Sequence, residues 1–206
     1  MFALLAAGLL LAQKLPPIDD AARNPEFQGF VRKLQAAVTK RDAKALKKLV
    51  DDDVVAFSEN KREEKGWAAF VKHWRPADAT SDLWEVLADF CDLGFVSLHP
   101  NVFVSPYVSW RFPRDRDARR ALVVTRAGVP LRGAPDREAG ILATLEFDIV
   151  DEIVDEIGGA VSVWRHVRTG AGVEGFVLAQ HLRSPFTPRG QFARKQGRWV
   201  LVALER

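Results

Sequence analysis

The sequence predicts an α+β protein in which a small, mainly helical N-terminal unit precedes a small β-barrel and a C-terminal β-hairpin. Within residues 24–112, apolar residues recur at spacings of three and four, which is typical of amphipathic helices. Residues 121–185 are richer in β-branched side chains, with Gly and Pro between short apolar runs, as in a sheet of short strands. Residues 190–204 contain two such runs around Gln196 and Gly197, which indicates a hairpin.

Length and composition indicate an ordinary globular protein. Its 206 residues are 48% hydrophobic and 28% charged, which suits one large domain or two modest ones. The formal net charge is only +3, and charges of both signs are spread along the chain. Because nucleic-acid binding needs Lys and Arg concentrated on one face, the composition argues against a nucleic-acid partner.

The first residues form a short apolar run, which predicts a signal peptide over residues 1–13. Apolar regions of signal peptides have about 7–15 residues, whereas a membrane-spanning helix needs about 20, so no membrane span is expected. Export predicts a periplasmic or secreted protein. No Lys or Arg precedes the run, so the alternative is a hydrophobic N-terminus that docks on the protein or frays.

Four helices are expected in the N-terminal unit. The first begins at Asn24 and Pro25, because Asn caps helix N-termini and Pro suits the first turn. The acidic run 51–53 is expected at a solvated corner after the second helix. The expected helices begin near residues 25, 42, 67 and 81 and end near residues 38, 50, 74 and 94, and residues 54–57 are expected to form a brief strand.

Residues 95–120 show no consistent period. Pro100, Pro106 and Pro113 interrupt any strand in this segment. Residues 113–120 alternate Asp with Arg, so we expect a solvated linker between the helical unit and the barrel.

An ordered set of short motifs follows in residues 121–185. Val129–Pro135 contains an apolar-x-Arg segment followed by Gly and Pro, Gly140–Leu145 is a Gly-x-Leu strand, Val163–Val167 contains Trp, and Gly175–Leu182 begins with Gly-Phe-Val. In this order they resemble the bacterial Src-homology-3-like (SH3b-type) domain family, which is common in exported and cell-envelope proteins. The resemblance implies a five-stranded barrel that binds a peptide, a peptidoglycan fragment or a protein partner.

The resemblance also implies a binding rim on the barrel. Loops there would carry Arg132, Asp136 and Arg137, and Trp164 and Phe176 would form an aromatic platform for an extended ligand. Ordinary core packing is the alternative role for both aromatic residues.

A second resemblance involves the two ends of the chain. The helical pattern of residues 37–50 and the terminal run 197–204 are similar to parts of cystatin-like α+β cones, a superfamily that includes ketosteroid isomerases and limonene-epoxide hydrolases. An intervening barrel would leave too few strands for the curved sheet of such a cone. The resemblance implies an alternative function, a small hydrolase or isomerase whose pocket is formed by the N-terminal helices and C-terminal strands. Its lining would come from four tryptophans, Trp67, Trp74, Trp84 and Trp110.

Motifs for catalysis or metal binding are not found. The four histidines (His73, His99, His166 and His181) have no zinc-site spacing, and the chain has no nucleophile elbow, P-loop or dinucleotide fingerprint. The single cysteine, Cys91, lies in an apolar helical pattern and is expected to be buried and inert. We therefore expect a non-enzymatic binding protein of the cell envelope, without cofactor or metal. In a third interpretation the barrel is only a structural docking unit.

Overall fold

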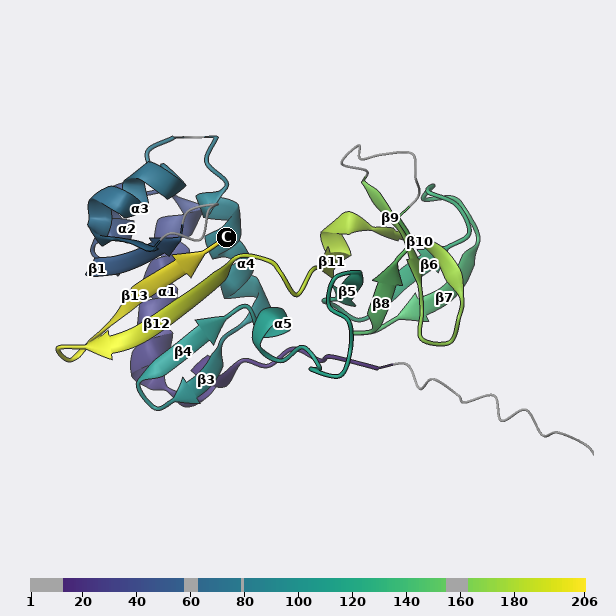
Figure 1. Ribbon diagram of the computed structural model, residues 1–206, viewed down its shortest axis with the longest axis horizontal. Helices are drawn as coiled ribbons and strands as arrows, with labels where there is room; N and C mark the ends of the chain where they lie inside the picture. Colours follow the sequence, from purple (N-terminus) through teal and green to yellow (C-terminus); the bar gives the residue numbers. More distant parts are fainter. Residues whose placement is uncertain (1–12, 58–62, 79, 155–162) are drawn as a thin grey trace, which may run out of the picture. The chain divides into compact units, whose positions relative to one another are not determined.

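The computed structural model describes residues 13–57, 63–78, 80–154 and 163–206, and these form two compact units. Within these described ranges, the larger unit contains residues 17–112 and 186–206, and the smaller contains residues 113–185 and residues 13–16. The chain therefore leaves the larger unit after Phe112 and returns to it at Phe186, as the colours of Figure 1 show. Each unit is described separately below.

The larger unit is built on a six-stranded sheet in the order β2-β1-β13-β12-β4-β3. Strands β1 and β13 are parallel, and the other neighbouring pairs are antiparallel. The strands are β1 (Val50–Phe57), β2 (Glu63–Lys65), β3 (Val96–His99), β4 (Val102–Ser105), β12 (Arg189–Lys195) and β13 (Arg198–Glu205).

Helices cover one face of this sheet (Figure 1). The Asn24 side chain accepts a hydrogen bond from the Phe27 amide at 3.0 Å, so the longest helix begins where its cap predicts. A 3-10 turn, η1 (Asp20–Arg23), precedes it, and a short helix, α5, follows β4. The α-helices are α1 (Pro25–Thr39), α2 (Ala43–Lys47), α3 (Gly66–Trp74), α4 (Leu83–Leu93) and α5 (Tyr107–Trp110).

Aromatic rings fill the space between the helices and the sheet. Phe27 lies fully buried, with its ring stacked on Phe103 at a centroid distance of 3.9 Å. The rings of Phe95, Phe192 and Trp199 meet the Phe27 ring edge-on. Edge-to-face and stacked pairs stabilise a core beyond the burial of their area.

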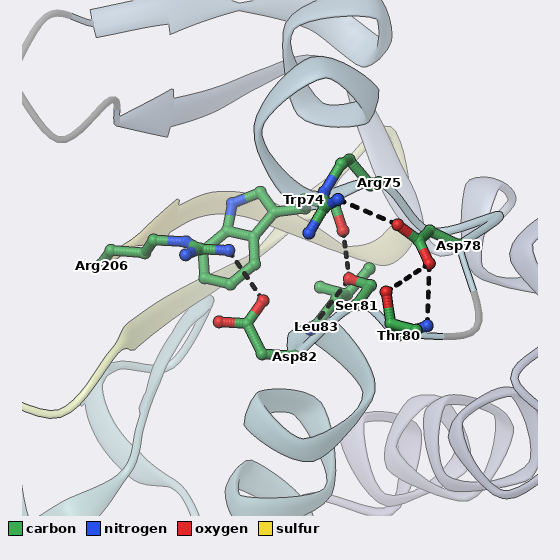
Figure 2. Close-up of polar contacts among 8 residues, drawn as sticks. All are labelled: Trp74, Arg75, Asp78, Thr80, Ser81, Asp82, Leu83 and Arg206. Carbon is green, nitrogen blue, oxygen red and sulfur yellow. Dashed lines mark hydrogen bonds and ion pairs between the residues drawn. The ribbon is translucent and has the colours of Figure 1, made fainter. Parts of the chain in front are cut away.

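The last residue of the chain is bound to the corner between α3 and α4 (Figure 2). The Arg206 guanidinium lies 4.5 Å from the Trp74 ring centroid and forms an ion pair with Asp82 at 2.7 Å. At the same corner the Ser81 hydroxyl donates to the Trp74 carbonyl and accepts from the Leu83 amide. These contacts attach the end of β13 to the helices that cover it.

The smaller unit is a seven-stranded antiparallel sheet in the order β11-β5-β8-β9-β10-β6-β7. Gln13 and Leu15 pair with residues 147–149, so the described N-terminal segment belongs to this unit. The strands are β5 (Ala121–Val124), β6 (Val129–Arg132), β7 (Ile141–Leu145), β8 (Ile149–Glu152), β9 (Trp164–Arg168), β10 (Glu174–Leu178) and β11 (Leu182–Arg183), with a 3-10 turn, η2 (Ala179–His181), before β11.

This architecture corrects the predicted fold class. Instead of a mainly helical N-terminal unit with a separate hairpin, the structure has a mixed six-stranded sheet with β12 and β13 near its centre. The sequence prediction missed β3 and β4 because the prolines of residues 95–120 hid two short strands on either side of a turn at Pro100. Asp51 to Asp53 lie within β1 rather than at a helix-to-strand corner.

The predicted five-stranded closed barrel is also wrong. In the described residues the sheet of the smaller unit is open, with β11 and β7 as its unpaired edges. The expected signal peptide, apart from Gln13, lies outside the described residues. Among the described helices, none has the length and hydropathy needed to cross a membrane.

Candidate binding cleft on the free face of the larger sheet

A cleft of about 660 Å³ lies on the face of the six-stranded sheet that the helices leave free. Four strands and the end of α5 contribute to it. Its lining residues are Asp53, Val55, Lys65, Trp110, Arg189, Gly190, Gln191, Lys195, Val202, Ala203 and Glu205. This volume is within the range of about 300–1,000 Å³ that is usual for small-molecule sites.

A β-bulge gives the cleft part of its apolar floor. Leu201 and Leu204 both pack in the helix-covered core, although residues three apart lie on opposite faces of a regular strand. The register shift between β12 and β13 places the two residues between them, Val202 and Ala203, at the cleft. Val55 on β1 completes this floor.

Two ion pairs involve charged residues of the lining. Lys195 Nζ lies 2.8 Å from Oδ1 of Asp51, which is not itself a lining residue. Arg189 Nη2 lies 2.8 Å from Glu205 Oε1, and both of these residues line the cleft. Burial raises the pKa of Asp51, but hydrogen bonds from Lys195 and the Asp53 amide, with the Lys195 and Arg198 charges, lower it further, so the net pKa lies below the usual value. Asp51 is therefore a carboxylate at neutral pH and a poor proton donor.

Lys65 and Asp53 provide charges that are not compensated in this way. Both are exposed, and neither side chain forms an ion pair with another described residue. Lys65 pairs with Val55 across the β1–β2 hairpin, so it lies on the same face as Asp53, diagonally at about 7–8 Å between Cα atoms. The Trp110 side chain, 39% exposed, adds an aromatic surface beside these charges.

The interior of the larger unit does not form the tryptophan-lined pocket expected for the enzyme alternative. Trp74 and Trp84 are buried in the core, and Trp67 stacks on Phe70 at 5.3 Å. Trp110 lies at the cleft on the opposite face of the sheet. The four tryptophans therefore do not line one cavity.

The described histidines His73, His166 and His181 and the cysteine lie apart from one another and outside the lining of the cleft. His73 contacts Glu64 at 3.2 Å, and His166 stacks on Phe176 in the other unit.

Burial, with the nearby Arg126 and Arg183 charges, lowers the pKa of His181. Burial, with the Asp92 charge, raises the pKa of the Cys91 thiol to about 12. Within the described ranges, no three His, Cys, Asp or Glu side chains are grouped so that they could hold a metal ion.

The predicted binding residues of the smaller unit are brought together only in part. Arg132 and Phe176 are paired on β6 and β10, and the Arg132 guanidinium donates to the Ala139 carbonyl at 2.6 Å. Trp164 and Phe176 are half-buried, and the strand alternation places both on the face opposite to the buried Val167 and Val177.

Asp136 and Arg137 lie in the loop between β6 and β7, where the Asp136 carboxylate accepts the Glu138 amide at 2.9 Å. The binding role of these five residues stays a prediction.

Sequence reasoning missed the cleft of the larger unit. Its residues come from four separate stretches of the chain, 53–55, residue 65, residue 110 and 189–205. One signal was present, since Arg189, Gln191 and Lys195 give the first strand of the C-terminal hairpin a polar face.

Comparisons with known proteins found no matching family model and no matching curated protein. Solved structures do match. A putative ketosteroid isomerase from Shewanella frigidimarina is 6% identical, with 86% of this chain and 90% of that chain covered and a TM-score of 0.30. An NTF2-like protein of unknown function from Pseudomonas putida is 12% identical, with coverages of 91% and 87% and a TM-score of 0.32. The association domain of C. elegans CaMKII is 12% identical, with coverages of 91% and 96% and a TM-score of 0.33.

These comparisons correct the sequence-based assignment. The open sheet of the smaller unit is not the closed barrel that the Src-homology-3-like resemblance implies. The matched structures carry NTF2-like and ketosteroid isomerase names, as in the cone alternative, rather than Src-homology-3-like names. The family assignment and the envelope-binding function inferred from it are therefore wrong, and no finding supports the predicted signal peptide or periplasmic location. At TM-scores this low the likeness carries no argument about activity, and the neighbours include both a putative enzyme and an association domain.

Proposed function

We propose that the larger unit is a non-enzymatic binding domain that takes up a small zwitterionic molecule, such as an amino acid or short peptide, in the cleft. The observation that carries this proposal is the arrangement of charges of both signs around an apolar floor and an exposed tryptophan. Small-molecule sites commonly combine apolar surface with a few placed polar groups.

The charges suit the two ends of such a ligand. A ligand carboxylate fits Lys65, and a ligand ammonium fits Asp53, because these two side chains have no ion-pair partner among the described residues. The ion pairs of Lys195 and Arg189 keep the remaining charges in place, so little ordering is needed when a ligand binds. The apolar part of the ligand would lie over Val202 against Trp110.

Binding is favoured over catalysis by the chemistry of the lining. The described lining contains no His, which is the most frequent general acid or base, and no Cys, Ser or Tyr. Its ionisable side chains are Asp, Glu, Lys and Arg. Lys195 is held in an ion pair with Asp51, and Arg189 is held in an ion pair with Glu205. This arrangement holds charge well but provides no poised proton-transfer pair.

Calorimetric titration with a panel of amino acids and dipeptides tests the proposal. We expect at least one zwitterion to bind, with Lys65→Gln and Asp53→Asn each weakening its affinity by about tenfold, the value of one charge-assisted hydrogen bond. Lys72→Gln is the matched control, because Lys72 is an exposed lysine paired with Glu64 outside the cleft. Trp110→Phe should reduce the tryptophan fluorescence change on binding.

Failure of every zwitterion to bind, or equal affinity in the cleft and control variants, would refute the proposal. The hydrolase or isomerase alternative has a different signature in the same experiment. It requires conversion of a bound panel member, detected by mass spectrometry of the titrated mixture.

A further inference from the structure

We propose that a groove along α1, on the helical side of the larger unit, is a docking site for an acidic amphipathic helix of a partner protein. The groove is separate from the cleft, and the proposal does not depend on the function assigned to the cleft. It follows from the shape of the groove, its apolar floor and the positive charge of its rim.

The groove consists of two adjoining hollows of about 430 and 310 Å³. They share Lys33, Lys48 and Leu49, so together they form one continuous depression. One wall is α1 with its C-cap residue Lys40, and the opposite wall is α2 followed by the β12–β13 turn. Because α1 has 15 residues, the groove has room for a partner helix about 20 Å long.

The floor of the groove is apolar. Ala36, Ala45 and Leu49 line one hollow, and the buried Phe30 and Trp199 lie at the base of the other. An amphipathic helix buries its apolar face in such a groove through residues spaced by three and four.

The rim of the groove carries four cations that no ion pair with a described carboxylate holds in place. Lys33, Lys40, Lys48 and Arg198 form no ion pair with any described carboxylate. Glu26, one of the two acidic residues in the lining, is held by Arg194 at 2.9 Å.

The other acidic residue of the lining, Asp42, caps α2 through the Lys44 and Ala45 amides. The Lys40 and Arg198 charges also lower the pKa of nearby carboxylates, those of Asp42 and Asp51. Since neither cation is held in an ion pair, the ammonium and guanidinium groups of the rim remain available to acidic groups of a partner.

The shape favours a protein helix over other anionic partners. A concave groove with an apolar base fits a convex rod that is apolar on one side and acidic on the other. A membrane surface is broad and would contact only the rim, and a nucleic acid would leave the apolar floor uncovered.

Fluorescence anisotropy with a labelled helical peptide tests this inference. The probe is a 15-residue peptide with leucines at helical spacing on one face and glutamates on the other, and its lysine-for-glutamate counterpart is the negative control. We expect saturable binding of the acidic peptide that weakens with salt, and a loss of at least tenfold in the Lys33→Glu, Lys48→Glu double variant.

The matched control is Lys44→Glu, Lys47→Glu. Lys44 and Lys47 both lie on α2 but do not line the groove. The same change of charge at these two positions should therefore weaken peptide binding much less. Circular dichroism and thermal melting of all variants show whether each is folded. Trp110→Phe and Lys65→Gln should leave peptide binding unchanged, which separates this result from the test of the cleft.

Two outcomes would overturn the inference. The first is equal affinity for the acidic peptide in the groove variant and the control variant. The second is groove-dependent binding that is stronger to phosphatidylglycerol vesicles or to a single-stranded oligonucleotide than to the peptide.

Discussion

The larger unit is filled with aromatic rings, whereas the smaller is filled with aliphatic side chains. The larger core includes Phe27, Phe103 and Phe192, and buried rings join its helices to its sheet. Among the described residues of the smaller unit, one apolar cluster contains no aromatic ring and is built from Val124, Val129, Leu131, Leu145, Val150, Val167, Val177 and Leu182. Close packing is thus reached with rings between the helices and the sheet of the larger unit, and with aliphatic side chains on the sheet of the smaller unit.

This difference has a functional consequence. In the larger unit the rings occupy the interior, and the described hollows of ligand size lie at its surface, on the free face of the sheet and along α1. Both sites that we propose for this unit accordingly lie on its surface.

Truncation of a central ring should have the largest effect on stability. Phe27→Ala removes a fully buried ring that contacts Phe103 and Trp199, and we expect a loss of about 3–5 kcal/mol in the free energy of unfolding. Val167→Ala, the matched truncation in the smaller unit, should cost about 2 kcal/mol because it removes less apolar volume. Hydrogen exchange followed by mass spectrometry measures the protection of backbone amides separately for peptides from each unit.

The expected pattern is local. Phe27→Ala should reduce protection mainly in α1 and β12, and Val167→Ala mainly in β9 and β10. Equal loss of protection across both units for either variant would contradict the view that they have independent cores.

Two glycines test how tightly each unit is packed. A Cβ at position 175 would lie 2.6 Å from the backbone oxygen of Arg132 on the paired strand, and one at position 190 would lie 2.5 Å from the Phe90 ring. Overpacking of this kind costs about 1–3 kcal/mol, and we expect Gly175→Ala to be the more costly because a paired backbone cannot move aside. Chemical denaturation measures both.

A second substitution separates the two cases. Phe90→Leu should recover part of the loss in Gly190→Ala, because it removes ring atoms that the new methyl group would meet. If Gly175→Ala costs less than Gly190→Ala, packing in the smaller unit is looser than its contacts indicate.

The smallest effect is expected from the ion pair beside the cleft. The folded-state pKa of Asp51 is lowered, so the unfolded state binds more protons in acid and the carboxylate stabilises the fold above its unfolded pKa of about 4. This stability is lost as the pH falls through the folded pKa. Asp51→Asn should therefore flatten the acid side of the stability curve, by less than about 1 kcal/mol because Lys195 is half-exposed.

The control for this prediction is Asp52→Asn, the exposed neighbour on the same strand. Urea denaturation at several pH values between 3 and 7 gives the slope for each variant. A slope unchanged by Asp51→Asn would mean that the Lys195 contact does not stabilise the folded state.

Local features of the fold were predictable, because short-range physics produces them. Asn24 and Pro25 start α1, and the turn at Gln196 and Gly197, both with positive φ, joins β12 to β13 as expected. Strands β3 and β4 were missed because each has four residues and prolines surround them, which is too short for a period to show. The candidate cleft was missed because no local pattern indicates which strands become neighbours.

The sequence by itself determined where helices and turns begin, and which side chains are large enough to fill a core. Only the tertiary structure decided that β1 pairs in parallel with β13, although almost the whole smaller unit lies between them in the chain. That pairing combines the two ends of the chain in one sheet, covers one face with helices and leaves the cleft on the other. The physical reason is that capping and turn preferences act over a few residues, whereas burial of an apolar face is satisfied by any complementary surface, however distant in sequence.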